Sequence, residues 1–234
     1  MYTDNTGRFP VRSRSGNQYI MIVYHFDSNA ITAAPFKYHA NKHRLPAYGS
    51  IMRHLKDRNT LVDLQIVDNK ASNNYKRIIK AKWGLGYQLV PSHIHCRNAA
   101  ECAIHTFKEN FLSILSGIAK TSPKNLWYLL ILKTELTLNL LWQSILNPNI
   151  LAWEYFLSPF DYNAIPIGPL VCPVMFYWKT SNCKSWDFRG KEGWSIGVAL
   201  DNYQFQRIIY HMTPRQSKSL IRWNSATKPS LPLW

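Results

Sequence analysis

The sequence predicts an α/β protein, in which a mixed sheet is flanked by helices and followed by a small C-terminal β appendage. Two observations lead to this prediction. Between residues 18 and 145, short runs rich in β-branched and aromatic residues alternate with stretches of helical periodicity. Beyond residue 160, several prolines precede apolar runs that are all strand-like. The resulting order, β-β-α-β-α-β-α-α, is typical of a sheet with helices packed against it.

The first expected elements form a β-hairpin. Gln18–Tyr24 and Ala30–Ala34 are apolar runs, and the Asp-Ser-Asn sequence between them supplies residues that favour a turn. The region from 37 to 60 is ambiguous because Pro46 interrupts any helical pattern. We therefore expect only one short helix there, over Ser50–Arg58.

The later elements follow from changes between a period of two and a period of 3.6 residues. We expect strands over Leu61–Val67 and Tyr87–Val90, helices over Asn73–Lys82, Asn98–Ile118, Leu126–Ile145 and Leu151–Leu157, and C-terminal strands over Val174–Trp178, Trp194–Leu200 and Gln204–Tyr210. A composition change near residues 160 to 170 predicts two domains, 1–160 and 161–234.

The charge balance indicates a polyanionic partner. The chain has 28 Lys and Arg against 13 Asp and Glu, which gives a formal net charge of +15. Such a field favours nucleic acid, and the alternative is a basic protein with no nucleic-acid role. No basic amphipathic helix that would favour a membrane surface stands out.

No element is expected to enter a membrane. The most apolar stretch, Leu126–Leu146, contains Lys133, Glu135, Asn139 and Gln143, which favours a buried helix over a membrane span. No apolar secretory segment is seen near the first residues, so we expect a protein that is not secreted. Four cysteines at this length do not predict a disulfide framework and favour a reducing compartment.

One carboxylate follows directly after a predicted strand. Alternation along the strand places Asp68 on the face of Leu64 and Ile66, which we expect to be the apolar face. A carboxylate at such a place has to be solvated, paired or bound to metal.

Two further carboxylates have comparable positions. Asp4 precedes a Thr-Gly turn, and Glu101 lies in the first turn of a predicted helix. Clustered carboxylates suit phosphoryl transfer, in which two divalent ions about 4 Å apart act on the attacking and leaving oxygens. The alternative is structural: Asp68 ends a strand, Glu101 is favoured by the helix dipole, and Asp4 is solvated.

Several segments resemble the integrase cores of retrotransposons, most closely those of copia-like or related long-terminal-repeat elements. They are residues 2–10 (YTDNTGRFP), 64–69 (LQIVDN) and 87–108 (YQLVPSHIHCRNAAECAIHTFK), and residues 16–31 and 190–200 also resemble such polyproteins. The resemblance covers nearly the whole chain and is weakest over 37–60. The resemblance implies a ribonuclease-H-like fold over 1–160, truncated at its N-terminus. It also implies that Asp4, Asp68 and Glu101 form a catalytic triad that binds two Mg²⁺ or Mn²⁺ ions.

The activity implied by the resemblance is metal-dependent DNA strand transfer during DNA integration. The implied partners are the DNA ends of the element and the target DNA, with a homo-oligomer as the active form, in the nucleus or a virus-like particle. Lys108 lies two helical turns after Glu101 and is a candidate phosphate ligand, or else a solvated lysine. Arg97 and Asn98, just before the helix, are similar candidates for DNA binding.

Departures from the family pattern predict weak or absent activity. The chain starts only three residues before Asp4, so most of the strand that should hold it is expected to be missing. Lys70 occupies a position that is usually acidic, and Cys96, Cys102 and His105 stand where Arg is familiar. Two alternatives therefore stay open: a DNA-binding relic without catalysis, and a domesticated interaction protein.

A zinc site is a further, weaker hypothesis. His93, His95, Cys96, Cys102 and His105 are residue types that bind zinc. Their spacing is too crowded for two ordinary ligand pairs, so we expect turn histidines and core cysteines, with Cys102 on the apolar face of its helix.

Overall fold

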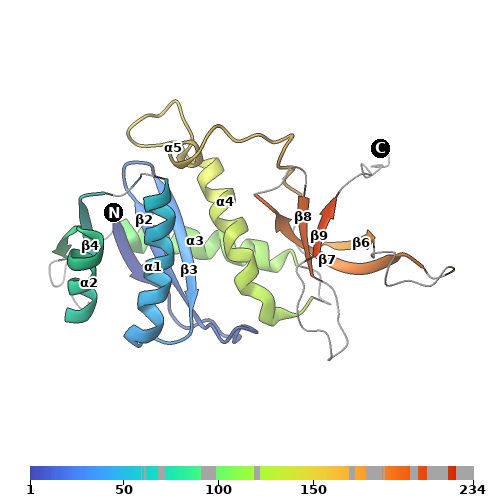
Figure 1. Ribbon diagram of the computed structural model, residues 1–234, viewed down its shortest axis with the longest axis horizontal. Helices are drawn as coiled ribbons and strands as arrows, with labels where there is room; N and C mark the ends of the chain where they lie inside the picture. The colour runs from blue at the N-terminus through green and yellow to red at the C-terminus, as the bar shows by residue number, and fades with distance from the viewer. Residues whose placement is uncertain are drawn as a thin grey trace. The chain divides into compact units, whose positions relative to one another are not determined.

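The computed structural model describes residues 1–58, 60, 62–67, 72–90, 99–118, 122–168, 172–177, 186, 188–200, 205–209 and 221–224 (Figure 1). The chain divides into two compact units. Unit 1 consists of Met1–Leu115 and Pro123–Pro159, and unit 2 consists of Ser116–Ser122 and Phe160–Trp234. Each unit contains its own sheet.

Unit 1 is built on a five-stranded mixed sheet with the order β3-β2-β1-β4-β5. The strands are β1 (Tyr2–Asn5), β2 (Tyr19–His25), β3 (Ala30–Phe36), β4 (Leu64–Val67) and β5 (Gly86–Leu89). Strands β1, β2 and β3 pair antiparallel, while β4 pairs parallel with both β1 and β5. This arrangement is consistent with a ribonuclease-H-like core, and the predicted fold class is confirmed.

The short strand β1 occupies the centre of the sheet. Thr3 pairs with Val23 of β2 on one side and with Val67 of β4 on the other. The amino group of Met1 donates a hydrogen bond of 2.9 Å to the Leu64 carbonyl. The strand that carries Asp4 is therefore present and bonded on both sides, contrary to the expectation that most of it is missing.

Helices cover both faces of this sheet. They are α1 (Asn41–Asp57), α2 (Asn73–Trp83), α3 (Ala99–Ser116), the 3₁₀ helix η2 (Lys124–Leu130), α4 (Ile131–Leu141) and α5 (Ala152–Phe156). In Figure 1, α1 lies in front of the strands and α3 behind them.

Helix α1 is longer than the sequence predicts, because it continues through Pro46. Proline costs a helical hydrogen bond. Burial of the helix after Pro46 offsets this cost, since Tyr48, Met52 and Leu55 are almost completely inaccessible to solvent. Tertiary packing therefore outweighs the local preference for a break.

The core between the sheet and helices α1 and α2 includes a buried polar network. Gln65 of β4 has no exposed surface. Its side-chain amide donates to Thr3 Oγ1 (2.8 Å) and Tyr75 Oη (3.3 Å), and its carbonyl accepts from Tyr48 Oη. Each polar group has a partner, as burial requires. Burial also raises the pKa of both tyrosines, so they act as neutral hydroxyls.

This network reverses the expected orientation of β4. Its fully buried side chains are Gln65 and Val67, whereas Leu64 is 44% exposed and Ile66 is half-buried. The face expected to be apolar is thus the less buried one. The physical reason is that three other elements supply hydrogen-bond partners for Gln65, which removes the usual cost of burying an amide.

Helix α4 covers the outer edge of β3. The Asn139 amide exchanges two hydrogen bonds with the backbone of Ile31, both of 2.9 Å. The Glu135 carboxyl accepts from the Ala33 N–H. These side chains form hydrogen bonds with backbone groups of β3 that an edge strand otherwise leaves unpaired.

The predicted helix over Leu126–Ile145 is confirmed only in part: the segment is divided into the 3₁₀ helix η2 and the α-helix α4, and α4 ends at Leu141. Within the described ranges, no helix combines the length and the hydropathy needed to cross a bilayer.

Glu135 predicts a specific dependence of stability on pH. Burial raises its pKa from 4.5 to about 8, so the folded state holds a proton that the unfolded state releases. Stability should be complete below pH 4.5 and should fall as the pH rises towards 8. Because the residue keeps some solvent contact, we expect a loss of about 2 kcal/mol, roughly half of what the pKa shift implies.

The measurement is the free energy of unfolding in urea between pH 5 and pH 9, compared with Glu135→Gln, which keeps the acceptor but cannot ionise. The difference between the two proteins should grow with pH, while other titrating groups cancel. Glu109→Gln, at a side chain that is 68% exposed, is the control and should follow the wild type. A constant difference between wild type and Glu135→Gln would contradict the assignment.

Unit 2 contains a four-stranded antiparallel sheet with the order β6-β7-β8-β9. Its strands are β6 (Pro173–Tyr177), β7 (Gly190–Val198), β8 (Phe205–Ile209) and β9 (Ile221–Asn224). Phe176 and Ile208 are buried, and the register shifts between Ser195 and Gly197. The first three strands were expected, whereas β9 was not.

Candidate functional site

The carboxyl ends of the parallel strands β1 and β4 meet the starts of two helices. Ser72 caps the start of α2 by accepting from the Tyr75 N–H (3.3 Å), and its hydroxyl donates to Asn41 Oδ1 (3.2 Å) at the first residue of α1. The N-termini of α1 and α2 are thus joined directly. Helix N-termini favour anions, and ligands of α/β sheets commonly bind at the carboxyl edge of the strands.

Asp4 lies on β1 at this edge. Its residue is half-buried, and its Oδ1 accepts a 2.7 Å hydrogen bond from the Asn5 N–H. Burial and the nearby Arg44 lower the pKa of His39, and the charge of Asp4 partly opposes this. Asp4 also acts on Tyr75, whose pKa is raised mainly by burial. The carboxylate is therefore close enough to influence a histidine and a buried tyrosine.

His39 and Arg44 were missed by the sequence reasoning. Both lie in the region from 37 to 60 that was ambiguous, and no motif marks them. The ring of His39 packs against Tyr19 with centroids 4.2 Å apart, and Arg44 lies over the ring of Tyr75 at 5.5 Å. Their position near Asp4 comes from the way α1 begins beside the end of β1.

Asp68, the second predicted acid, lies outside the described residues. Its neighbour in the chain is Val67, the last residue of β4. Val67 pairs with Thr3, which in turn precedes Asp4. The predicted convergence of the three acids within about 8 Å stays a prediction.

Glu101, the third predicted acid, is exposed in the first turn of α3. The predicted DNA ligand Lys108 is also exposed, whereas Arg97 and Asn98 fall outside the described ranges. The buried stripe of the helix consists of Ala100, Ala103, Ile104, Phe107 and Phe111.

Cys102 lies off that stripe and is exposed, so the expectation of a core cysteine was wrong there. His105 is 3.4 Å from Glu109 across one helical turn. His93, His95 and Cys96 are not among the described residues. In the part of the chain that is described, no three His, Cys, Asp or Glu side chains gather in a way that could hold a metal ion.

An aromatic cluster fixes the helix that carries Glu101. Phe111 of α3 packs edge-on against Phe9 (5.9 Å between centroids) and Trp127 (6.2 Å), and Phe9 and Trp127 are 4.6 Å apart. The Trp127 indole donates to the Val11 carbonyl at 2.8 Å. The segment after β1 is thereby joined to α3, so the elements that carry Asp4 and Glu101 belong to one packed assembly.

A solved structure shares this architecture. The chain is similar to a chain of the simian T-cell lymphotropic virus intasome in complex with PP2A regulatory subunit B56 gamma, determined by cryo-EM. The TM-score is 0.53 with 14% sequence identity, over 88% of this chain and 70% of that chain. The likeness is one of fold. No family model and no curated protein matches the sequence.

Proposed function

We propose that this chain is an integrase-type catalytic core, which joins DNA ends to target DNA in a metal-dependent strand transfer. The observation that carries the proposal is the position of Asp4 on the central strand, where its neighbour Thr3 pairs with Val67 at the end of β4. The ribonuclease-H-like strand order and the likeness to a chain of a viral intasome complex support it. Its working place would be the nucleus or a virus-like particle, as part of a homo-oligomer.

In this proposal, Asp4, Asp68 and Glu101 hold two Mg²⁺ or Mn²⁺ ions. Carboxylate oxygens are the hard donors that these ions prefer, and Asp4 and Glu101 both keep solvent contact. When bound, such ions would favour attack by a 3′-hydroxyl and departure of the leaving oxygen. Lys108, Arg97 and Asn98 are the proposed contacts to DNA phosphates.

The test is the joining of a labelled oligonucleotide end to plasmid DNA in Mg²⁺ or Mn²⁺. Because Lys70 and the other departures from the family pattern predict weak activity, we expect at most a small amount of metal-dependent product from the wild type. Asp4→Asn should give only background, because asparagine keeps the shape but loses the charge that binds metal. Asp57→Asn, an exposed acid at the end of α1, is the matched control and should behave like the wild type. Equal product from wild type and Asp4→Asn would exclude the catalytic assignment.

Metal binding provides a readout that does not depend on activity. Mn²⁺ at about 100 times its Kd should stabilise the wild type by about 2.7 kcal/mol. The corresponding rise in Tm is about 5 to 10 °C and should be absent from Asp4→Asn. A similar rise in both proteins would place the metal elsewhere.

A second candidate function is DNA binding without catalysis. It is favoured by the basic character of α2, which carries Lys76, Arg77, Lys80 and Lys82 and no acid. DNA binding without joining and without stabilisation by Mn²⁺ would select this function.

A further inference from the structure

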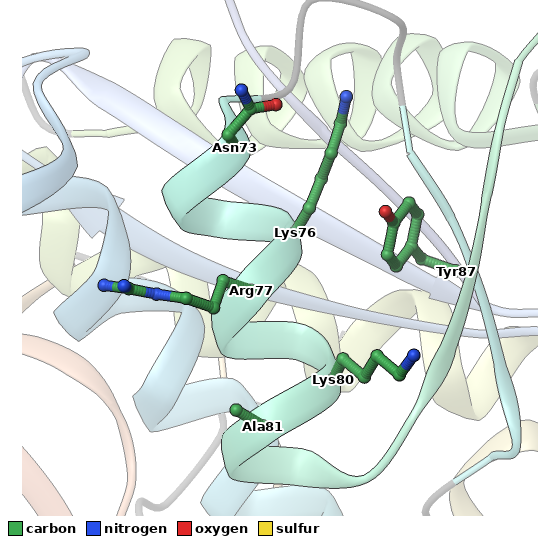
Figure 2. A pocket seen from close by; sticks show the side chains of 6 residues that line it. All are labelled: Asn73, Lys76, Arg77, Lys80, Ala81 and Tyr87. Carbon is green, nitrogen blue, oxygen red and sulfur yellow. The ribbon is translucent and has the colours of Figure 1, made fainter.

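A basic groove lies between helix α2 and the strand β5, at the end of the sheet away from β3. It has a volume of about 570 Å³ and is lined by Asn73, Lys76, Arg77, Lys80, Ala81 and Tyr87. Figure 2 shows Lys80 extending from α2 towards β5, Lys76 extending along the same side of the helix towards the end with Asn73, and the ring of Tyr87 extending from β5 towards α2. Arg77 extends to the other side of the helix.

The two lysines form a row of positive charge. They are four residues apart, which places them one above the other on the same face of α2. No carboxylate of the described ranges forms an ion pair with either lysine. The helix dipole stabilises the positive charge of Lys80, which is in the last turn of α2. It does not stabilise the charge of Lys76, which lies one turn closer to the N-terminus of the helix. An anion with repeated charges would relieve the repulsion between the two ammonium groups.

The opposite wall of the groove offers an aromatic surface. Tyr87 is 41% exposed, although it belongs to a strand of the sheet. Ala81, which lines the groove from the helix, has only a methyl side chain and leaves room beside the ring. An exposed ring next to a row of cations is the arrangement with which proteins bind unpaired bases and their phosphates.

We propose that this groove binds a single-stranded segment of nucleic acid, with phosphates at Lys76 and Lys80 and a base stacked on Tyr87. A duplex keeps its bases stacked inside and cannot offer one to the tyrosine, so the exposed ring selects an unpaired strand. The groove starts at Asn73, the first residue of α2, and the charge of Asp4 acts on Tyr75 in the first turn of the same helix. The biological role of this groove rests on the proposed function, since the inference names the form of DNA that the integrase-type core would hold near Asp4.

The test measures binding of a labelled single strand of about 12 nucleotides by fluorescence anisotropy, with the duplex of the same sequence in parallel. All samples contain EDTA, so binding is independent of metal and of catalysis. We expect Lys76→Gln/Lys80→Gln to weaken single-strand binding at least tenfold and to reduce the slope of log K against log salt by about 1.4, for two lost contacts.

Tyr87→Ala should weaken single-strand binding by about five- to a hundredfold, with little change for the duplex, while Tyr87→Phe should bind like the wild type. The matched control is Arg53→Gln/Lys56→Gln, which removes two exposed charges from α1 and should weaken binding less than threefold. Circular dichroism of each variant verifies that it is folded.

The groove is excluded if the α1 and α2 double variants weaken binding equally, or if Tyr87→Ala binds like the wild type. It is also excluded if Tyr87→Ala weakens duplex and single strand alike. Asp4→Asn should bind normally in this assay, so failure of the groove and failure of the catalytic proposal are separate results.

Discussion

Duplex DNA should bind to this protein about 10³ to 10⁵ times more weakly at about 200 mM salt than at about 50 mM, if six to ten phosphates are contacted. The reason is the net charge of +15, which attracts the polyanion and releases its counterions. The cations of α2 are part of this field and have no acid among them. Added salt lowers the free energy gained when counterions leave the DNA, and so weakens binding of the protein.

The measurement is a titration of two duplexes of unrelated sequence over a series of salt concentrations. Both should give the same steep slope, because contacts to phosphates do not depend on sequence. A flat salt dependence would contradict electrostatic binding. A large preference for one duplex would show that base edges are read, for which nothing in the sequence provides a motif.

Trp127→Ala should destabilise unit 1 by about 3 to 5 kcal/mol. The indole is 1% exposed and fills the space between Phe9 and Phe111. Its removal leaves a cavity and also leaves the Val11 carbonyl without its 2.8 Å donor. Because this cluster joins α3 to the segment after β1, the variant should also loosen the elements that carry Asp4 and Glu101.

Urea denaturation followed by far-ultraviolet circular dichroism gives the change in the unfolding midpoint. Trp186→Ala is the control, since that side chain is 98% exposed and its loss should change stability by about 0.5 kcal/mol or less. Trp127→Phe, which keeps an aromatic ring but loses the N–H, should fall between the two. Equal midpoints for the two alanine variants would show that the cluster does not hold the fold together.

Elements with a clear local pattern could be predicted from the sequence. The β2–β3 hairpin, α2, α3 and β4 lie within a few residues of their expected positions. In the hairpin and in α2, the period of the apolar residues agrees with the turn or capping residues at the ends, whereas β4 was found in its expected place with the opposite face buried. Such agreement is local, so it can be read without knowing what the element packs against.

Other elements depend on partners far away in the chain. Pro46 within α1 is tolerated because the helix is buried against the sheet, and the strand β1 is too short to be recognised without β2 and β4 on its two sides. Gln65 is buried because Thr3, Tyr48 and Tyr75 provide its hydrogen bonds. None of these contacts leaves a periodic signal in the sequence.

The candidate site shows the same division. By itself the sequence determined the mixed α/β class, the strongly basic charge, and the acids at Asp4, Asp68 and Glu101 as candidates. The tertiary structure alone decided that Asp4 lies on the central strand near His39, that Cys102 faces outward, and that Lys76, Lys80 and Tyr87 line one groove. Strand register and helix packing bring these residues together. Both depend on contacts between segments that are far apart in the sequence, and no local sequence pattern records such contacts.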